Sequence, residues 1–157
     1  MVTVPATTDI GQGVAGTISG TSVSEAFNTP SEIFTVTLTD ATGQLSATGS
    51  RVNSSGTNRV TITGGLSAVN AALATLTDIE PTSGIDTIGL SASDSYGGVA
   101  MPGNVEVTIN GRPTLTVPGS AQIVMGQTGT IVGVSLAESG DTSNETFSVT
   151  LSSVAGL

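Results

Sequence analysis

The feature that most constrains this chain is an internal repeat. With a shift of 113 positions, residues 2–38 align with residues 115–151 without a gap, and 17 of the 37 aligned pairs are identical. A period of this length is typical of tandem modules, in which neighbouring copies stack along one axis. We therefore expect a complete unit over residues 2–114 and the first third of a second, incomplete unit over residues 115–157. The chain would then be a piece of a longer protein with further copies.

Alternation of apolar and polar residues dominates the unit. In residues 33–40, IFTVTLTD, every second side chain is apolar, which is typical of a strand with one buried face. Similar segments lie near residues 2–5, 14–22, 44–48, 59–63, 85–94 and 105–109, which makes about seven strands. Seven short antiparallel strands in about 100 residues predict an all-β, immunoglobulin-like sandwich. The expected core comprises Phe34, Val36, Leu38, Ile62, Ile88, Leu90, Val105 and Val107.

One segment has a different period. In residues 66–76, LSAVNAALATL, the apolar side chains of Leu66, Val69, Leu73 and Leu76 recur at helical spacing. We expect one short helix near 66–76, with Ser67 as its cap, crossing one end of the sandwich.

Composition excludes most catalytic chemistry. The chain has no Cys, His or Lys and carries a net charge of −9, with only three arginines. A Ser-His triad, a Cys nucleophile, a Schiff base and an ordinary zinc site are therefore absent. Acid pairs such as Asp78 and Glu80 are available to a glycosidase, but the chain has one Tyr and no Trp to stack on a sugar. We expect no enzyme activity, and the charge disfavours nucleic acid as a partner.

Two longer motifs identify a family resemblance. Residues 60–77 read VTITGGLSAVNAALATLT, and residues 85–98 read IDTIGLSASDSYGG. With residues 17–25, TISGTSVSE, and 107–113, VTINGRP, they resemble the cadherin-like and immunoglobulin-like repeats of giant bacterial surface or secreted proteins of the adhesin type. The resemblance implies a cadherin-like sandwich and an extracellular location at the bacterial cell surface. It also implies a part in cell adhesion or biofilm formation, with neighbouring repeats of the same chain as partners.

Carboxylates are the remaining candidate ligands, and calcium is the one metal that they suggest. Alternating strand directions place Glu25, Glu32 and Asp94 at one pole of the sandwich. Asp9 and Asp40 fall in turns at the opposite pole, near the linker residue Asn110, where the next repeat would bring Glu138, Asp141 and Glu145. The linker, residues 109–113, lacks the acidic residues of cadherin calcium sites. Dispersed, solvated carboxylates are therefore the alternative interpretation of both groups.

Three functions remain open. The first is a structural spacer repeat of a large extracellular adhesin. The second is a binding module that recognises a glycan or a protein through the loops of residues 25–32 and 94–98, with Tyr96 as an exposed contact. The third is an accessory domain of an extracellular enzyme. No cofactor is expected beyond possible calcium, and no segment is apolar enough to insert into a membrane.

The incomplete second copy carries a further expectation. Its apolar residues Ile131, Phe147, Val149 and Leu151 have no partner sheet in their own unit. We expect residues 2–114 to fold normally, while residues 115–157 seek the edge of a neighbouring molecule. A strand-exchanged oligomer is the alternative outcome.

Overall fold

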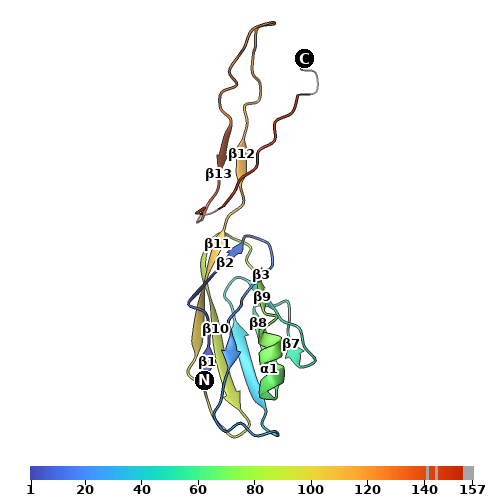
Figure 1. The fold of residues 1–157 in the computed structure, drawn as a ribbon, viewed down its shortest axis with the longest axis vertical. Coiled ribbons are helices and arrows are strands. Elements are labelled where there is room, and N and C mark those ends of the chain that lie inside the picture. The colour runs from blue at the N-terminus through green and yellow to red at the C-terminus, as the bar shows by residue number, and fades with distance from the viewer. Residues whose placement is uncertain (141, 144, 154–157) are drawn as a thin grey trace.

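The computed structural model describes residues 1–140, 142–143 and 145–153 (Figure 1). These residues form an all-β body with one short helix, and a long hairpin projects from one end of the body. The prediction of an all-β chain with a single helix near 66–76 is confirmed.

The largest sheet has six strands. Their order is β2-β11-β10-β5-β8-β7, and β2 pairs with β11 in parallel while the other neighbours are antiparallel. The bounds of these strands, in chain order, are β2 Thr7–Gly11, β5 Phe34–Thr39, β7 Val52–Asn53, β8 Arg59–Gly64, β10 Gly84–Asp94 and β11 Gly103–Asn110.

Two smaller sheets complete the body. One has the order β3-β9-β6, with β3 at Gly16–Thr17, β9 at Thr77–Ile79 and β6 at Gln44–Ser46. The other pairs β1 (Val2–Thr3) with β4 (Ser22–Val23). The strand expected over residues 14–22 is thus wrong in its extent, because this segment pairs with two different sheets in turn.

Buried side chains from the sheets and the helix form one core. All eight residues expected to be buried are buried, and Phe34 is only 3% exposed. The register explains this result, because Val36 lies opposite Ile62 on one side and Ala92 on the other. Alternation along β5 therefore places its apolar side chains against those of both neighbouring strands.

Helix α1, Leu66–Leu73, follows β8 directly and buries Val69, Ala72 and Leu73. It is shorter than expected, since residues 74–76 form a turn in which Leu76 N–H donates to the Leu73 carbonyl. The N-cap is Gly65, with no side-chain cap, so the role given to Ser67 is wrong. Asn70 holds the helix to β4, because its side chain donates to the Val23 carbonyl and accepts from Val23 N–H.

The projecting hairpin follows β11 after a short link. Strand β12, Thr114–Thr116, pairs with β13, Ser135–Ala137. Residues 146–150 pass beside the base of this hairpin (Figure 1). With Leu115 and Leu136 they line a hollow. The apolar side chains of Ile131, Phe147, Val149 and Leu151 are between 40% and 75% exposed. They therefore lack the buried packing of their equivalents in the body.

Two phenylalanines test this description of the core. Phe34→Ala should lower the free energy of unfolding by about 3–5 kcal/mol, because it leaves a cavity among buried side chains. Phe27 is 98% exposed, so Phe27→Ala should change the free energy of unfolding by less than about 0.5 kcal/mol. Urea unfolding of both variants measures the difference, and similar values would contradict the register of β5.

The exposure of residues 115–153 gives a second prediction. Limited proteolysis should cut the chain first between residues 117 and 134, while residues 1–112 resist. A protein that ends at Thr114 should melt within a few degrees of the full chain. Light scattering of both proteins shows whether the exposed hairpin recruits a second molecule. Equal resistance of all segments, with both proteins monomeric, would contradict the prediction.

Candidate functional site

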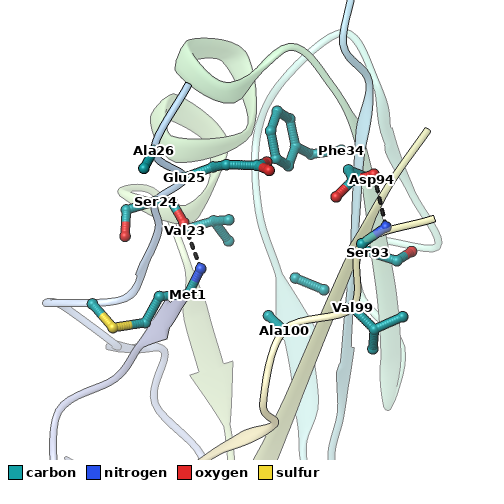
Figure 2. Close-up of a pocket in the computed structure, with 12 residues that line it drawn as sticks. Met1, Val23, Ser24, Glu25, Ala26, Phe34, Ser93, Asp94, Val99 and Ala100 are labelled. Atoms are coloured by element: carbon teal, nitrogen blue, oxygen red, sulfur yellow. Dashed lines mark hydrogen bonds between the residues drawn. The ribbon is translucent and has the colours of Figure 1, made fainter. Parts of the chain in front are cut away.

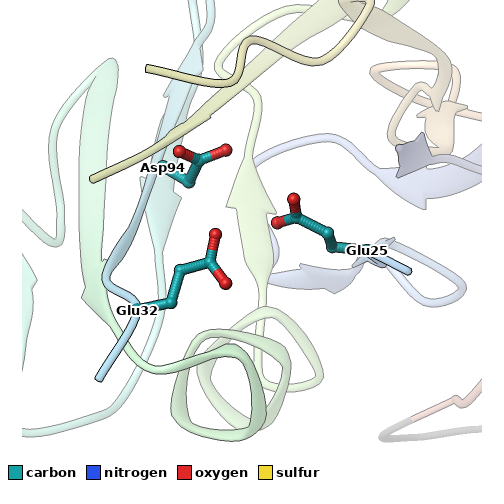
Figure 3. A group of neighbouring side chains, drawn as sticks. All are labelled: Glu25, Glu32 and Asp94. Carbon is teal, nitrogen blue, oxygen red and sulfur yellow. The ribbon is translucent and has the colours of Figure 1, made fainter. Parts of the chain in front are cut away.

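The body has an acidic cluster on each of two sides. We call the end at which β11 leads into β12 the junction pole and the opposite end the distal pole. At the distal pole, Glu25, Glu32 and Asp94 each bring one carboxylate oxygen within 4.8 Å of the other two (Figure 3). Glu25 follows β4, Glu32 precedes β5 and Asp94 ends β10. The structure brings this predicted trio together, and metal binding by it stays a prediction.

Two of these carboxylates already have hydrogen-bond donors. Glu32 is 4% exposed and accepts a hydrogen bond of 3.0 Å from Thr29 N–H. Asp94 accepts from Tyr96 N–H at 2.7 Å and from Gly98 N–H at 3.0 Å, which holds the turn after β10. Desolvation and the charges of Glu32 and Asp94 raise the pKa of the exposed Glu25. The hydrogen bonds of Glu32 and Asp94 thus stabilise a loop and a turn without any ion.

A cleft of about 390 Å³ opens beside the distal cluster, between Met1, Glu25, Phe34, Asp94 and Val99 (Figure 2). The terminal amine of Met1 donates to the Ser24 carbonyl and closes one side. Tyr96, 71% exposed, and Phe27, 98% exposed, are both surface aromatics at this part of the chain. Phe27 also has a φ of +67°, a conformation that is costly for an aromatic residue.

The second cluster lies on the junction side of the body and is buried. It comprises Asp40 after β5, Asp78 in β9, Glu80 after β9 and Asp86 in β10, and we call it the buried acidic cluster. Oxygens of Asp40, Glu80 and Asp86 lie within 4.8 Å of one another. Asp78 and Glu80 are 0% exposed and Asp40 is 6% exposed. Burial of three carboxylates beside a fourth, partly exposed one is costly unless protons or cations compensate them.

Few donors reach these carboxylates. Asp40 Oδ1 accepts from Thr42 N–H at 2.9 Å and from Gly43 N–H at 2.7 Å. The Thr42 hydroxyl lies 2.9 Å from Glu80 Oε2 and 2.6 Å from Asp86 Oδ2. Among the residues that the structure describes, no hydrogen-bond partner reaches Asp40 Oδ2, either oxygen of Asp78 or Glu80 Oε1. The turn after β5 thus donates hydrogen bonds to some carboxylate oxygens of the cluster and leaves the others without a donor.

Burial and mutual repulsion shift the pKa values of these groups. Desolvation, followed by the charge of Asp40, raises the pKa of Asp78 to about 6. Desolvation, with the charges of Asp40 and Asp78, raises the pKa of Glu80 to about 8 against the hydrogen bond from Thr42. Desolvation also raises the pKa of Asp40. The pKa of Asp86 is lowered, because hydrogen bonds from Thr42 and Thr87 outweigh its desolvation.

The other predicted ligands do not form one site. Asp9 is exposed in the middle of β2 rather than in a turn, and it does not join the cluster that contains Asp40. Asn110 donates a hydrogen bond of 3.0 Å to Glu145 Oε1, so the linker meets the following segment as expected. The charge of Glu145, with desolvation, raises the pKa of Glu138. Asp141 lies outside the described residues.

Sequence reasoning missed the grouping of Asp78, Glu80 and Asp86 with Asp40. A signal was present, because Asp78 and Glu80 are two residues apart and therefore project from the same face of an extended segment. Asp78 pairs with the buried Leu45 across β6, which places that face inward. The crossover that brings β9 beside the turn after β5 cannot be inferred from the sequence pattern.

No protein family matches this chain, and neither the curated proteins nor the solved structures include a match to it. In the part of the chain that the structure describes, no helix is long and apolar enough to cross a membrane.

The raised pKa values predict an unusual dependence on pH. Folded Asp78 and Glu80 hold their protons at pH values at which the unfolded chain has lost them, so their contribution to stability is largest below the unfolded pKa values of 3.8 and 4.5 and falls as the pH rises through about 6 and about 8. As the pH rises to about 8, deprotonation charges the buried cluster and the melting temperature should fall by at least several degrees.

Thermal melts in chelator between pH 4.5 and pH 8.5 measure the slope of melting temperature against pH. Asp78→Asn and Glu80→Gln should each flatten it, because neither replacement can ionise. Asp9→Asn, at an exposed strand position, should leave it unchanged. A melting temperature that stays constant or rises across the window would show that the two carboxyls are not protonated in the folded state.

Proposed function

We propose that this chain is a spacer segment of a large bacterial extracellular protein of the adhesin type, built from tandem immunoglobulin-like repeats. The observation that carries the proposal is a repeated strand register. Val2 pairs with Val23 and Thr3 with Ser22, and Leu115 pairs with Leu136 and Thr116 with Ser135. Each residue of the second pair of strands lies 113 positions after its equivalent in the first. The sequence repeat is thus accompanied by the same pairing of strands.

Contacts across the junction support a fixed geometry between repeats. Gly111 N–H donates to the Ser139 carbonyl at 2.7 Å, and the hydroxyls of Ser83 and Ser139 lie 2.9 Å apart. A Cβ atom at Gly111 would come within 2.5 Å of the Ser139 carbonyl oxygen, so the close approach requires glycine. Arg112 donates to the Gln12 carbonyl and Pro113 restricts the backbone that follows. A short link with these contacts acts as a semi-rigid spacer.

The mechanism of such a spacer is geometric. Each repeat adds a constant length, and the stiff junction prevents successive repeats from folding back on one another. The acidic surface, with net charge −9, keeps neighbouring chains apart and soluble. A binding tip elsewhere in the parent protein would thus be held at a set distance from the cell.

Completion of the second repeat tests the proposal. Residues 39–114 can be attached after Leu151, since residues 115–151 are equivalent to residues 2–38. Small-angle X-ray scattering of this two-repeat protein should give a maximum dimension about twice that of one repeat. Gly111→Val should shorten or broaden the distance distribution, because the side chain displaces Ser139. Gly119→Val, where a Cβ meets nothing within 4 Å, is the control. A flexible distribution in the unmutated protein would contradict a spacer function.

A binding module is the second candidate function, and the exposed aromatics of the distal pole favour it. Phe27 follows Ala26 and Tyr96 lies two residues after Asp94, both of which line the cleft, and the two aromatic side chains are 98% and 71% exposed. Phe27 aligns with Gly140 in the second copy, so this aromatic is not a feature of every repeat. A glycan array probed with the chain and with its Phe27→Ser, Tyr96→Ser variant decides the matter. Selective binding that the variant loses would favour recognition over spacing.

A further inference from the structure

We propose that the buried acidic cluster of Asp40, Asp78, Glu80 and Asp86 is a calcium site, with Thr42 as a fifth oxygen donor. This site lies inside one repeat, between the turn after β5, strand β9 and strand β10. It differs from the distal trio, and it shares only Asp40 with the ligands predicted near the linker. Its test is also independent of the tandem-repeat function, because all its residues belong to residues 40–86.

Unpartnered oxygens of buried side chains point to a missing ligand. Asp78 is 0% exposed and neither of its oxygens has a hydrogen-bond partner. The same holds for Glu80 Oε1, on a side chain that is also 0% exposed, and for Asp40 Oδ2. Buried polar atoms are hydrogen-bonded in the great majority of cases. Four such atoms in one place therefore point to a shared partner, which a cation would supply.

The unpartnered oxygens converge on the space beside Gly43. A Cβ atom placed on Gly43 would lie 2.5 Å from Asp78 Oδ1 and 2.9 Å from Asp40 Oδ2, and closer still to Glu80 Oε1. Three carboxylates from two segments thus face one small space, and the nearest oxygens are the unpartnered ones. Calcium binds oxygens at 2.3–2.6 Å, so small side-chain movements would complete its coordination. Gly43 leaves the space open, since any other residue would fill it.

The Thr42 hydroxyl gives a second indication of an extra positive charge. This hydroxyl is within hydrogen-bond distance of both Glu80 Oε2 and Asp86 Oδ2, but it has one proton to donate. The second carboxylate must therefore carry a proton of its own or share a cation with its neighbours. A cation would compensate all four carboxylates at once, whereas a single proton compensates only one.

The donor set selects calcium among the common metals. It consists entirely of oxygen atoms, and the chain has no His or Cys to favour zinc. Magnesium requires near-octahedral geometry at shorter distances and retains several waters, which a buried pocket of carboxylates suits less well. Asp86 is partly exposed and Thr42 is exposed, so both provide a path for the ion from solvent.

Bound calcium would fasten the segments that lead to the junction. Backbone groups next to Glu80 already hold the loop after β2, since Gly13 N–H donates to the Glu80 carbonyl and Gln12 donates to the Pro81 carbonyl. Ser83, three residues after Glu80, meets Ser139 across the junction. The ion would therefore stabilise the junction side of the body more than its distal pole.

Calorimetric titration of the chelator-treated full chain with calcium chloride at pH 7.5 tests the site. We expect one ion per chain, with a Kd of about 10⁻⁴ M or tighter, and magnesium chloride should bind at least about 10-fold more weakly. With 5 mM calcium the melting temperature should rise by at least about 4 °C over that in chelator. No heat and equal melting temperatures would overturn the proposal.

Variants locate the ion. Asp78→Asn and Glu80→Gln should each weaken calcium binding at least about 10-fold, and Gly43→Ala should do so while it retains every carboxylate. Glu32→Gln, in the distal trio, is the matched control and should leave the Kd unchanged. Circular dichroism and the melting temperature in chelator check folding, and Asp78→Asn should melt no lower than the unmutated chain because it removes a buried repulsion. Calcium binding lost in Glu32→Gln and retained in Asp78→Asn and Gly43→Ala would overturn the assignment.

Discussion

The pairing of β5 with both β8 and β10 is the interaction on which the rest of this structure depends. Phe34, Val36 and Leu38 are buried between these partners, and together they form the middle of the core. The chain has few aromatics, so its core is made from β-branched and Leu side chains that need close interdigitation. Both acidic clusters are built on the ends of this pairing. Asp94 lies opposite Phe34 at one end, and Asp40 follows the other end directly.

The two clusters differ because their surroundings differ. At the distal pole, the carboxylates accept hydrogen bonds from backbone N–H groups or are exposed to solvent. On the junction side, Asp78 and Glu80 are buried where neither solvent nor an adequate number of donors reaches them. Groups of similar numbers of acidic residues therefore do not make equivalent sites. Burial without a partner distinguishes a candidate ligand site from a solvated acidic surface.

Much of the fold could be predicted from the sequence, because strand and helix periods depend on local residues. Alternation in β5 and the helical spacing of Leu66, Val69 and Leu73 both identified real elements and their buried faces. The distal trio followed from strand direction alone. The short strands β2, β7 and β9 were missed, since β2 and β9 pair with distant segments and β7 has only two residues. The buried acidic cluster depends on β9, so it could not be found before the crossover was known.

The hairpin of β12 and β13 has a consequence for the order in which such a chain acquires structure. It has the register of β1 and β4, yet it is formed with no help from a helix or a large sheet of its own repeat. The instruction for this pairing is therefore contained within about 23 consecutive residues, and closure of so short a loop is fast. During synthesis from the N-terminus, each new copy would acquire its first contact with the preceding, finished repeat before its central strands exist. The array would then grow from an established end, one module at a time, with no stage at which two incomplete cores compete for the same strand.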